Sequence, residues 1–150
     1  MEPVKKDGME GLYQALLQRA AEARETAYCP YSGFAVGAAL LCADGTVYSG
    51  CNIECASLSP GSCAERTAFF RAVGDGKREF LAIAIAGGPA HEPPRELCPP
   101  CGVCRQVMRE FCGPDFEILL TDGTNQKRYT LAELLPVSFG PEQLGEREKC

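Results

Sequence analysis

The sequence has little histidine, no long apolar run and no excess of positive charge. His91 is its only histidine, and it lies in a Pro/Gly-rich stretch, so a metal site would need mainly other ligands. No apolar run approaches the roughly 20 residues that span a bilayer, and no signal peptide is recognisable. The 15 basic and 20 acidic residues give a net charge of -5, which disfavours binding of a polyanion. We therefore expect a cytoplasmic protein that acts on a small molecule, with no nucleic-acid or membrane partner.

The length of the chain indicates one domain. With 150 residues, of which 45% are hydrophobic, the chain can bury one sizeable core but is too short for two independent ones. We predict a single domain over residues 1–150, with a core at about 9–144 and short flexible tails.

Hydrophobic periodicity predicts alternating helices and strands. Leu12, Leu16 and Ala20 follow one face of a helix over about 7–27, and Asp44-Gly45 is typical of a hairpin turn. The expected helices are 7–27, 63–73, 101–111 and 131–135; the expected strands are 36–42, 46–52, 80–86, 116–121 and 127–130. This order indicates an α/β fold with one mixed five-stranded sheet and helices on its faces, a three-layer α/β/α arrangement.

The ten cysteines suggest metal ligation rather than disulfides, because no export signal is recognisable. Cys101 and Cys104 are three residues apart at the start of a predicted helix, so they share one face of its first turn. Cys63 lies at the start of another helix. Helix N-termini stabilise thiolates. Three thiolates leave one position of a tetrahedral Zn²⁺ open, which is typical of a catalytic site.

Charged residues beside these cysteines fit the same interpretation. Glu65, two residues after Cys63, could take a proton from a water on the open position and hand it on. Three thiolates outweigh the charge of Zn²⁺, so a positive group is needed nearby. Arg66 and Arg105 are candidates, together with the two helix N-termini.

From about Tyr28 to Leu144 the chain resembles the small, homotetrameric zinc cytidine deaminases of pyrimidine salvage. The resemblance rests on the segments CPYSGFAVGAAL, SGCNIE, CAERTA, PCGVCRQ and LLPVSFGP, and Cys-x-Glu with Pro-Cys-x-x-Cys is the three-cysteine signature of zinc nucleobase deaminases. It implies a cytidine deaminase-like fold and one Zn²⁺ per chain, bound by Cys63, Cys101 and Cys104. It also implies hydrolysis of cytidine and deoxycytidine to uridine and deoxyuridine with release of ammonia, in which Glu65 moves the protons.

The same resemblance implies further site residues. Asn52 and Glu54 would hydrogen-bond the ribose hydroxyls, Phe34 would pack against the pyrimidine, and the backbone N–H of Ala64 would hold the substrate carbonyl. Phe139 would reach the site of a neighbouring subunit in a homotetramer.

Two features depart from the family pattern. Cys55-Ala56-Ser57-Leu58 stands where the family usually has Asn-Ala-x-aromatic, and Leu58 lacks the hydroxyl of a tyrosine. The preference between cytidine and deoxycytidine is therefore left open. Cys98, close before the CxxC pair, is an additional thiol with no assigned role.

Three alternative functions stay open at the level of sequence. Cys98 could close a four-cysteine, non-enzymatic zinc module. Cys101 and Cys104 could act as a redox dithiol, which would leave Cys63 and Glu65 unexplained. A zinc deaminase could act on another cytosine-bearing molecule, either an antibiotic or a base in nucleic acid; the acidic charge disfavours nucleic acid.

Overall fold

The computed structural model describes residues 6–145, and its elements follow the predicted order. Of the tails predicted on either side of 9–144, residues 1–5 and 146–150 lie outside the described residues, whereas residues 6–8 form the start of α1. The helices are α1 (Lys6–Ala23), α2 (Ala64–Gly74), α3 (Gly102–Phe111) and α4 (Leu131–Leu134), with short 3-10 helices η1 (Arg24–Thr26) and η2 (Pro141–Leu144). The strands are β1 (Phe34–Cys42), β2 (Val47–Cys51), β3 (Phe80–Pro89), β4 (Glu117–Thr121) and β5 (Gln126–Thr130). The helix η2 was not predicted from the sequence.

The strands form one mixed sheet, as predicted. Its spatial order is β2-β1-β3-β4-β5. β3 and β4 run parallel, whereas the other neighbouring pairs are antiparallel. The crossover between the two parallel strands contains α3, so this helix is fixed against the sheet by the strands on both sides of it in sequence.

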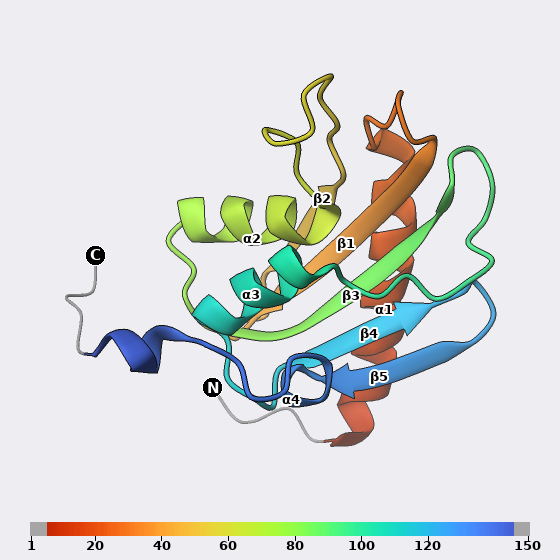
Figure 1. Ribbon diagram of the computed structural model, residues 1–150. Coiled ribbons are helices and arrows are strands. Elements are labelled where there is room, and N and C mark those ends of the chain that lie inside the picture. Colours follow the sequence, from red (N-terminus) through yellow and green to blue (C-terminus); the bar gives the residue numbers. More distant parts are fainter. Residues whose placement is uncertain (1–5, 146–150) are drawn as a thin grey trace.

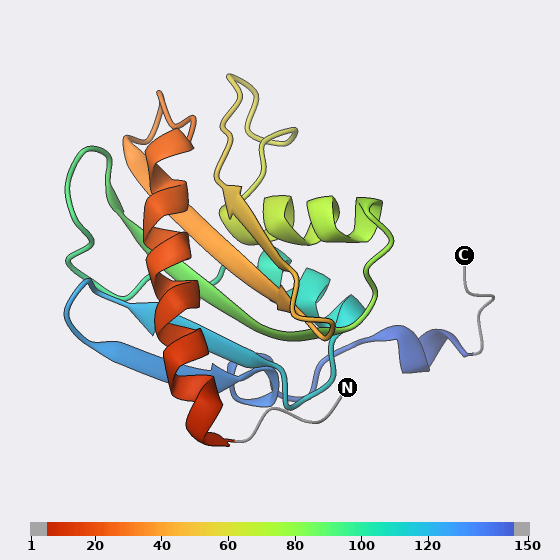
Figure 2. The ribbon, with the colours of Figure 1, turned by 180° about the vertical axis from the view of Figure 1, so that it is seen from behind.

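Helices cover both faces of the sheet, which confirms the three-layer architecture. α2 and α3 lie on the face seen in Figure 1, and Figure 2 shows α1 crossing the opposite face. Alternate residues of β1 serve the two sides: Ala38 and Leu40 pack in the core with α2 and α3, whereas Ala39 and Leu41 pack in the core with α1. Because both of its faces are covered, β1 is apolar almost throughout rather than alternating.

The face that carries α2 and α3 has an aromatic core. Phe69 of α2 contacts Phe80, Phe111 and Phe116, with ring centroids 5.1 to 6.1 Å apart. Phe69 is completely buried. These contacts join α2, the start of β3 and the end of α3 into one packed unit.

α2 approaches β2 very closely at Gly50. A Cβ atom at this position would lie 2.6 Å from the backbone nitrogen of Ala68 and would also collide with the carbonyl oxygen of Ala64. Both atoms belong to the backbone of α2, so they cannot move without shifting the helix. The absence of a side chain at Gly50 therefore sets the distance between the first turns of α2 and the sheet.

No helix within residues 6–145 combines the length and the hydrophobicity that a membrane span requires.

We predict that Gly50→Ala lowers the free energy of unfolding by about 3 kcal/mol, the upper part of the range for overpacking, because the new methyl group displaces α2. Gly11→Ala is the control. Gly11 lies in α1 with nothing within 4 Å of its Cβ position, so alanine should stabilise the helix by about 0.5–1 kcal/mol. Urea denaturation of both variants measures these changes; equal stability of Gly50→Ala and the wild type would contradict the close approach.

Candidate metal centre

The two helix starts carry the cysteines of the predicted metal site. Cys63 is the N-cap of α2 and Cys101 is the N-cap of α3, each with extended backbone conformation. Neither thiol caps its own helix by a hydrogen bond. Each sulfur is therefore available to a ligand beside backbone N–H groups that carry partial positive charge.

The structure brings the three predicted sulfur ligands together. The Sγ atoms of Cys63 and Cys101 are 3.7 Å apart, those of Cys101 and Cys104 are 3.4 Å apart, and all three lie within 4.8 Å of one another. A tetrahedral Zn²⁺ with bonds of about 2.3 Å requires S···S separations of about 3.8 Å. The group therefore fits a zinc ion in both size and chemistry, because thiolates favour a soft metal of this kind.

Arg66 supplies the positive charge that three thiolates around Zn²⁺ were predicted to need. Its Nη2 donates a hydrogen bond of 3.5 Å to Cys63 Sγ, and its Nε is buried without a hydrogen-bond partner among the described residues. Hydrogen bonds from the Cys104 thiol and from Arg66 lower the pKa of Cys63 to about 5, against the opposing effect of burial. The hydrogen bond to Cys63 and burial raise the pKa of Cys104. The site thus already stabilises a thiolate at Cys63.

Arg105 does not share this role. Its Nε donates to the carbonyl of Pro100 at 2.8 Å, and its Nη1 donates to the carbonyl of Leu134 at 2.6 Å. These bonds tie the start of α3 to the end of α4. Of the two arginines considered from the sequence, the structure places only Arg66 on a sulfur ligand.

Glu65 lies in the first turn of α2 and is only 4% exposed. A glutamate that merely stabilised the helix dipole would lie in solvent. Burial is the main cause that raises the pKa of Glu65, and the nearby negative charge of Cys63 acts in the same direction. A buried carboxyl group next to the three sulfurs is suited to exchange protons with a molecule bound there.

Asn52 and Glu54 follow β2 and line a hollow of about 200 Å³ together with Cys63 and Arg66. Asn52 also has a structural task that the sequence did not reveal. Its Oδ1 accepts from the backbone N–H of Val36, and its Nδ2 donates to the carbonyl of Phe34, both at 2.8 Å. The amide therefore fixes the first residues of β1.

Glu54 makes a similar connection to the turn before β1. Its Oε1 accepts from the backbone N–H groups of Tyr31 and Ser32 at 3.0 and 3.1 Å. Hydrogen bonds from Ser32, followed by the one from Tyr31, hold the pKa of Glu54 below its ordinary value. The carboxylate is thus kept ionised at the edge of the hollow.

Three further residues, Ala64, Phe34 and Phe139, were predicted from the sequence to bind substrate. Ala64 is buried at the first position of α2, next to the sulfurs. Phe34, at the start of β1, is partly exposed and lines a separate hollow of about 300 Å³ with Gly87, Gly88 and Leu97 among its other residues. Phe139 follows α4 and is 59% exposed.

Cys98 lies outside the three-sulfur group. Its side chain packs against Gly87, where a Cβ would come within 2.6 Å of its sulfur. Burial raises the pKa of Cys98 to about 11, and the charges of Glu65 and Cys63 add to this shift. Cys98 is therefore a protonated thiol near the site, and the structure contradicts the closed four-cysteine alternative.

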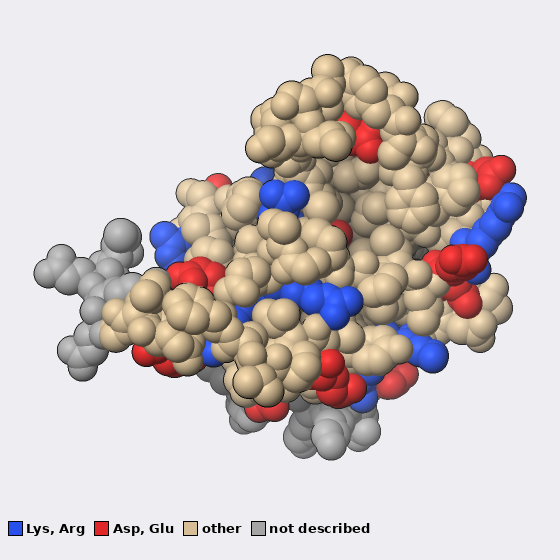
Figure 3. Space-filling model, viewed as in Figure 1, with Lys and Arg blue, Asp and Glu red and all other residues tan. Residues whose placement is uncertain are grey.

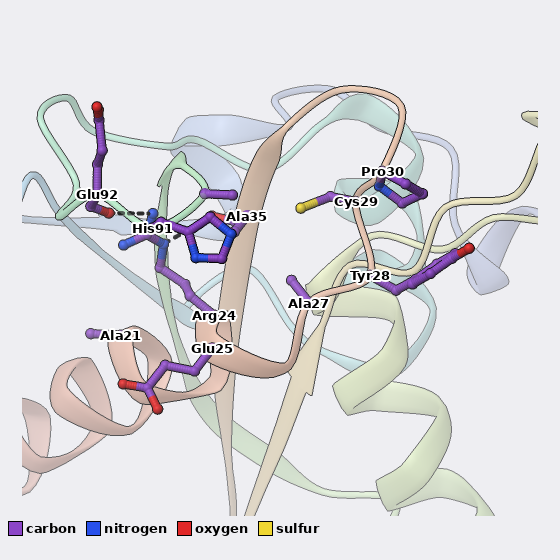
Figure 4. A pocket seen from close by; sticks show the side chains of 11 residues that line it. Ala21, Arg24, Glu25, Ala27, Tyr28, Cys29, Pro30, Ala35, His91 and Glu92 are labelled. Atoms are coloured by element: carbon purple, nitrogen blue, oxygen red, sulfur yellow. Dashed lines mark hydrogen bonds between the residues drawn. The ribbon is translucent and has the colours of Figure 1, made fainter.

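Arg24 is a positioning residue for which no local sequence pattern provides a signal. Its Nε donates to the carbonyl of Ala35 at 2.9 Å, and its Nη2 donates to the carbonyls of Pro89 and Glu92 at 3.1 and 3.0 Å. Arg24, Ala35 and Glu92 line a cavity of about 550 Å³ (Figure 4), at which the carboxylates of Glu25 and Glu92 are directed away from the ring of His91. Arg24 thereby ties the beginning of β1 to the loop after β3. His91 does not belong to the group of three sulfurs.

Comparison with known proteins decides the family. Residues 11–119 match the family described as "Cytidine and deoxycytidylate deaminase zinc-binding region". The chain belongs to this deaminase family. The match includes the three sulfurs, Glu65 and the hairpin before them, and it excludes the redox alternative, because this is a zinc-binding family.

Individual deaminases of the family are similar over most of their length. The cytidine deaminase of Sporosarcina psychrophila is 47% identical over 135 residues, 87% of this chain and 93% of the relative. That of Halalkalibacterium halodurans is 45% identical, with 89% of this chain and 98% of the relative covered. The crystal structure of cytidine deaminase from Burkholderia pseudomallei is 47% identical with a TM-score of 0.76, covering 84% of this chain and 98% of that one.

We predict that Cys104→Ala abolishes zinc binding, because two sulfurs cannot hold the ion against solvent. Cys42→Ala is the matched control, since Cys42 and Cys104 are both buried. Cys98→Ser is a second control. Metal analysis of the purified proteins should find one zinc per chain in both controls and none in Cys104→Ala, while circular dichroism checks folding. A full zinc equivalent in folded Cys104→Ala, or its loss from Cys98→Ser, would contradict the three-sulfur site.

Proposed function

We propose that the protein deaminates cytidine and deoxycytidine by hydrolysis, giving uridine or deoxyuridine and ammonia. The observation that carries this proposal is the buried carboxyl group of Glu65 beside three sulfurs at two helix starts. The similarity to cytidine deaminases over nearly their whole length supports the substrate class.

The three sulfurs of Cys63, Cys101 and Cys104 would hold the zinc ion. When bound, Zn²⁺ supplies a Lewis acid that lowers the pKa of water. The three thiolates outweigh the charge of the ion, which would weaken this effect. Arg66, hydrogen-bonded to Cys63, and the N-termini of α2 and α3 offset that negative charge.

Glu65 performs the proton transfers in this proposal. Its carboxylate accepts a proton from the water that adds to C4 of the cytosine ring, and then donates a proton to the amino group, which leaves as ammonia. C4 gains one oxygen and loses one nitrogen, so the atoms of cytidine and water are recovered in uridine and ammonia. The buried position of Glu65 keeps it from exchanging protons with bulk water.

Asn52 and Glu54 are proposed to bind the sugar hydroxyls. An amide nitrogen has two donors, and the hydrogen bond to Phe34 uses one of them. A carboxylate has about four acceptor sites, and the bonds from Tyr31 and Ser32 use part of this capacity. Both side chains are therefore fixed by the backbone and still able to bind a hydroxyl group.

Two further groups complete the proposed substrate contacts. The ring of Phe34 packs against the pyrimidine, supported by its partial exposure at the start of β1. The backbone N–H of Ala64, one of the unpaired donors of the first helical turn, holds the substrate carbonyl.

Leu58, which lines the same hollow as Asn52 and Glu54, offers no hydrogen bond to the sugar. A panel of cytidine, deoxycytidine, cytosine and cytidine monophosphate measures the resulting preference.

We further propose a homotetramer in which neighbouring subunits share active sites. Several large apolar side chains of the loop after β2, of α2, of α3 and of the segment after α4 are exposed in the single chain: Leu58, Phe70, Val103, Val137 and Phe139. Figure 3 shows that uncharged residues cover much of this face, which is hollowed below the loop that follows β2. Exposed apolar groups of this kind favour contact with another subunit.

The proposed setting is pyrimidine salvage in the cytoplasm. The nine cysteines among the described residues are all free, and none of them forms a disulfide. Free thiols at the metal centre suit a reducing compartment, because oxidation would remove the zinc ligands.

Glu65→Gln should retain one zinc per chain and lose turnover of cytidine by about 100-fold to 10,000-fold, because the amide cannot accept and return a proton. Glu79→Gln, at an exposed position, is the control and should turn over normally. Ammonia release and metal content are measured on the same preparations. Normal turnover by Glu65→Gln would overturn the proposed mechanism, and no turnover by the wild type would overturn the proposed function.

Mixed subunits test the shared active site. Phe139→Ala should raise KM for cytidine, whereas Glu65→Gln subunits should be inactive but still present an intact Phe139. When the two variants are dissociated and reassembled together, a component with wild-type KM should appear, because Phe139 of one subunit completes the Glu65-containing site of another. Kinetics that equal the sum of the two separate proteins would contradict sharing through Phe139.

A further inference from the structure

Two side chains of α3, those of Gln106 and Arg109, hold the segment that carries Phe139. Gln106 donates from Nε2 to the carbonyl of Phe139 at 2.9 Å. Arg109, one turn further along the helix, donates from Nε to the hydroxyl of Ser138 at 2.9 Å. The backbone carbonyl of Phe139 and the residue before it, Ser138, are thus both bound to α3.

Arg109 also binds Glu142, near the beginning of η2. Its Nη1 and Nη2 donate to the two carboxylate oxygens of Glu142 at 3.1 and 2.7 Å. This is the bidentate geometry that a guanidinium offers and an ammonium does not. Three nitrogens of one side chain therefore hold residues on both sides of Phe139.

Gly140 allows the chain to lie directly on the guanidinium group. A Cβ atom at Gly140 would come within 2.5 Å of both Nη atoms of Arg109. The backbone of Gly140 is extended, with φ -152, so alanine could adopt it without backbone strain. Contact with Arg109, rather than backbone conformation, is what requires a glycine here.

We propose that Arg109 is a positioning residue that sets the place and orientation of Phe139 for substrate binding. This proposal rests on the proposed function, because it takes Phe139 to contact the substrate. α3 then has two tasks: its first turn supplies Cys101 and Cys104 to the metal centre, and its last turns fix the segment that presents an exposed aromatic ring. The metal centre and Phe139 share one rigid helix.

The contribution of Arg109 should appear in substrate binding more than in folding. The Arg109 side chain is 20% exposed and that of Glu142 is 65% exposed, so the ion pair is open to solvent on the Glu142 side, and solvent-exposed ion pairs add little to stability. Losing the contacts frees residues 138–142 to move, and these must be ordered again when substrate binds. Arg109→Ala should raise KM for cytidine about fivefold to tenfold, the cost of immobilising one or two side chains.

The experiment compares four variants for kcat, KM, zinc content and thermal unfolding. Arg109→Ala and Gly140→Ala remove the same contact from opposite sides, the second without changing any hydrogen-bonding group. Lys77→Ala is the matched control, because Lys77 forms a comparable surface ion pair with Asp44 far from the site. Arg109→Ala combined with Phe139→Ala tests whether Arg109 acts through the aromatic ring.

The expected result is a raised KM in Arg109→Ala and Gly140→Ala, with zinc content and kcat unchanged and a normal KM in Lys77→Ala. In the Phe139→Ala background, Arg109→Ala should raise KM no further. Unchanged KM in Arg109→Ala, or an effect that adds fully to that of Phe139→Ala, would overturn the positioning role. A normal KM in Phe139→Ala would overturn both this role and the proposed contact of Phe139, whereas the proposed deamination would fail only if the wild type does not turn over cytidine.

Discussion

The meeting of two helix N-termini over one group of sulfur atoms is the constraint on which the rest of the structure depends. Cys63 and Cys101 are the N-caps of α2 and α3, and their sulfurs lie 3.7 Å apart. Three thiolates this close repel one another unless positive charge is near. The partial charges of the two helix starts, Arg66 and a bound Zn²⁺ supply it. The same arrangement places Glu65 one residue inside α2, where the packing of the helix buries its carboxyl group.

The fold maintains this meeting point through close packing rather than through the metal alone. Gly50 lets α2 lie on β2 without an intervening side chain, and Phe69 locks α2 to the end of α3 through Phe111. Parallel pairing of β3 and β4 requires a crossover, and α3 is that crossover. A shift of either helix would separate sulfurs that must stay within bonding distance of one ion.

Local patterns made much of the fold and site predictable. Periodicity located the helices and strands within a few residues, and the spacing of Cys63, Glu65, Cys101 and Cys104 indicated their common chemistry before their positions were known. The order of the strands and the parallel pair were not predictable in this way, because they depend on contacts between residues far apart in sequence. Arg66 and Arg105 looked equivalent from sequence, and only the direction of their side chains separates them. The backbone-fixing bonds of Asn52, Arg24 and Arg109 also span 11 to 68 residues and leave no local pattern.

The central claim is that one zinc ion, held at the two helix starts beside Glu65, makes this chain a cytidine deaminase. Stepwise addition of Zn²⁺ to metal-free protein, with ammonia release from cytidine measured at each step, tests it most directly. Turnover should rise in proportion to bound zinc and reach its maximum at one ion per chain. Full turnover by the metal-free protein, or a requirement for a second ion, would contradict the account.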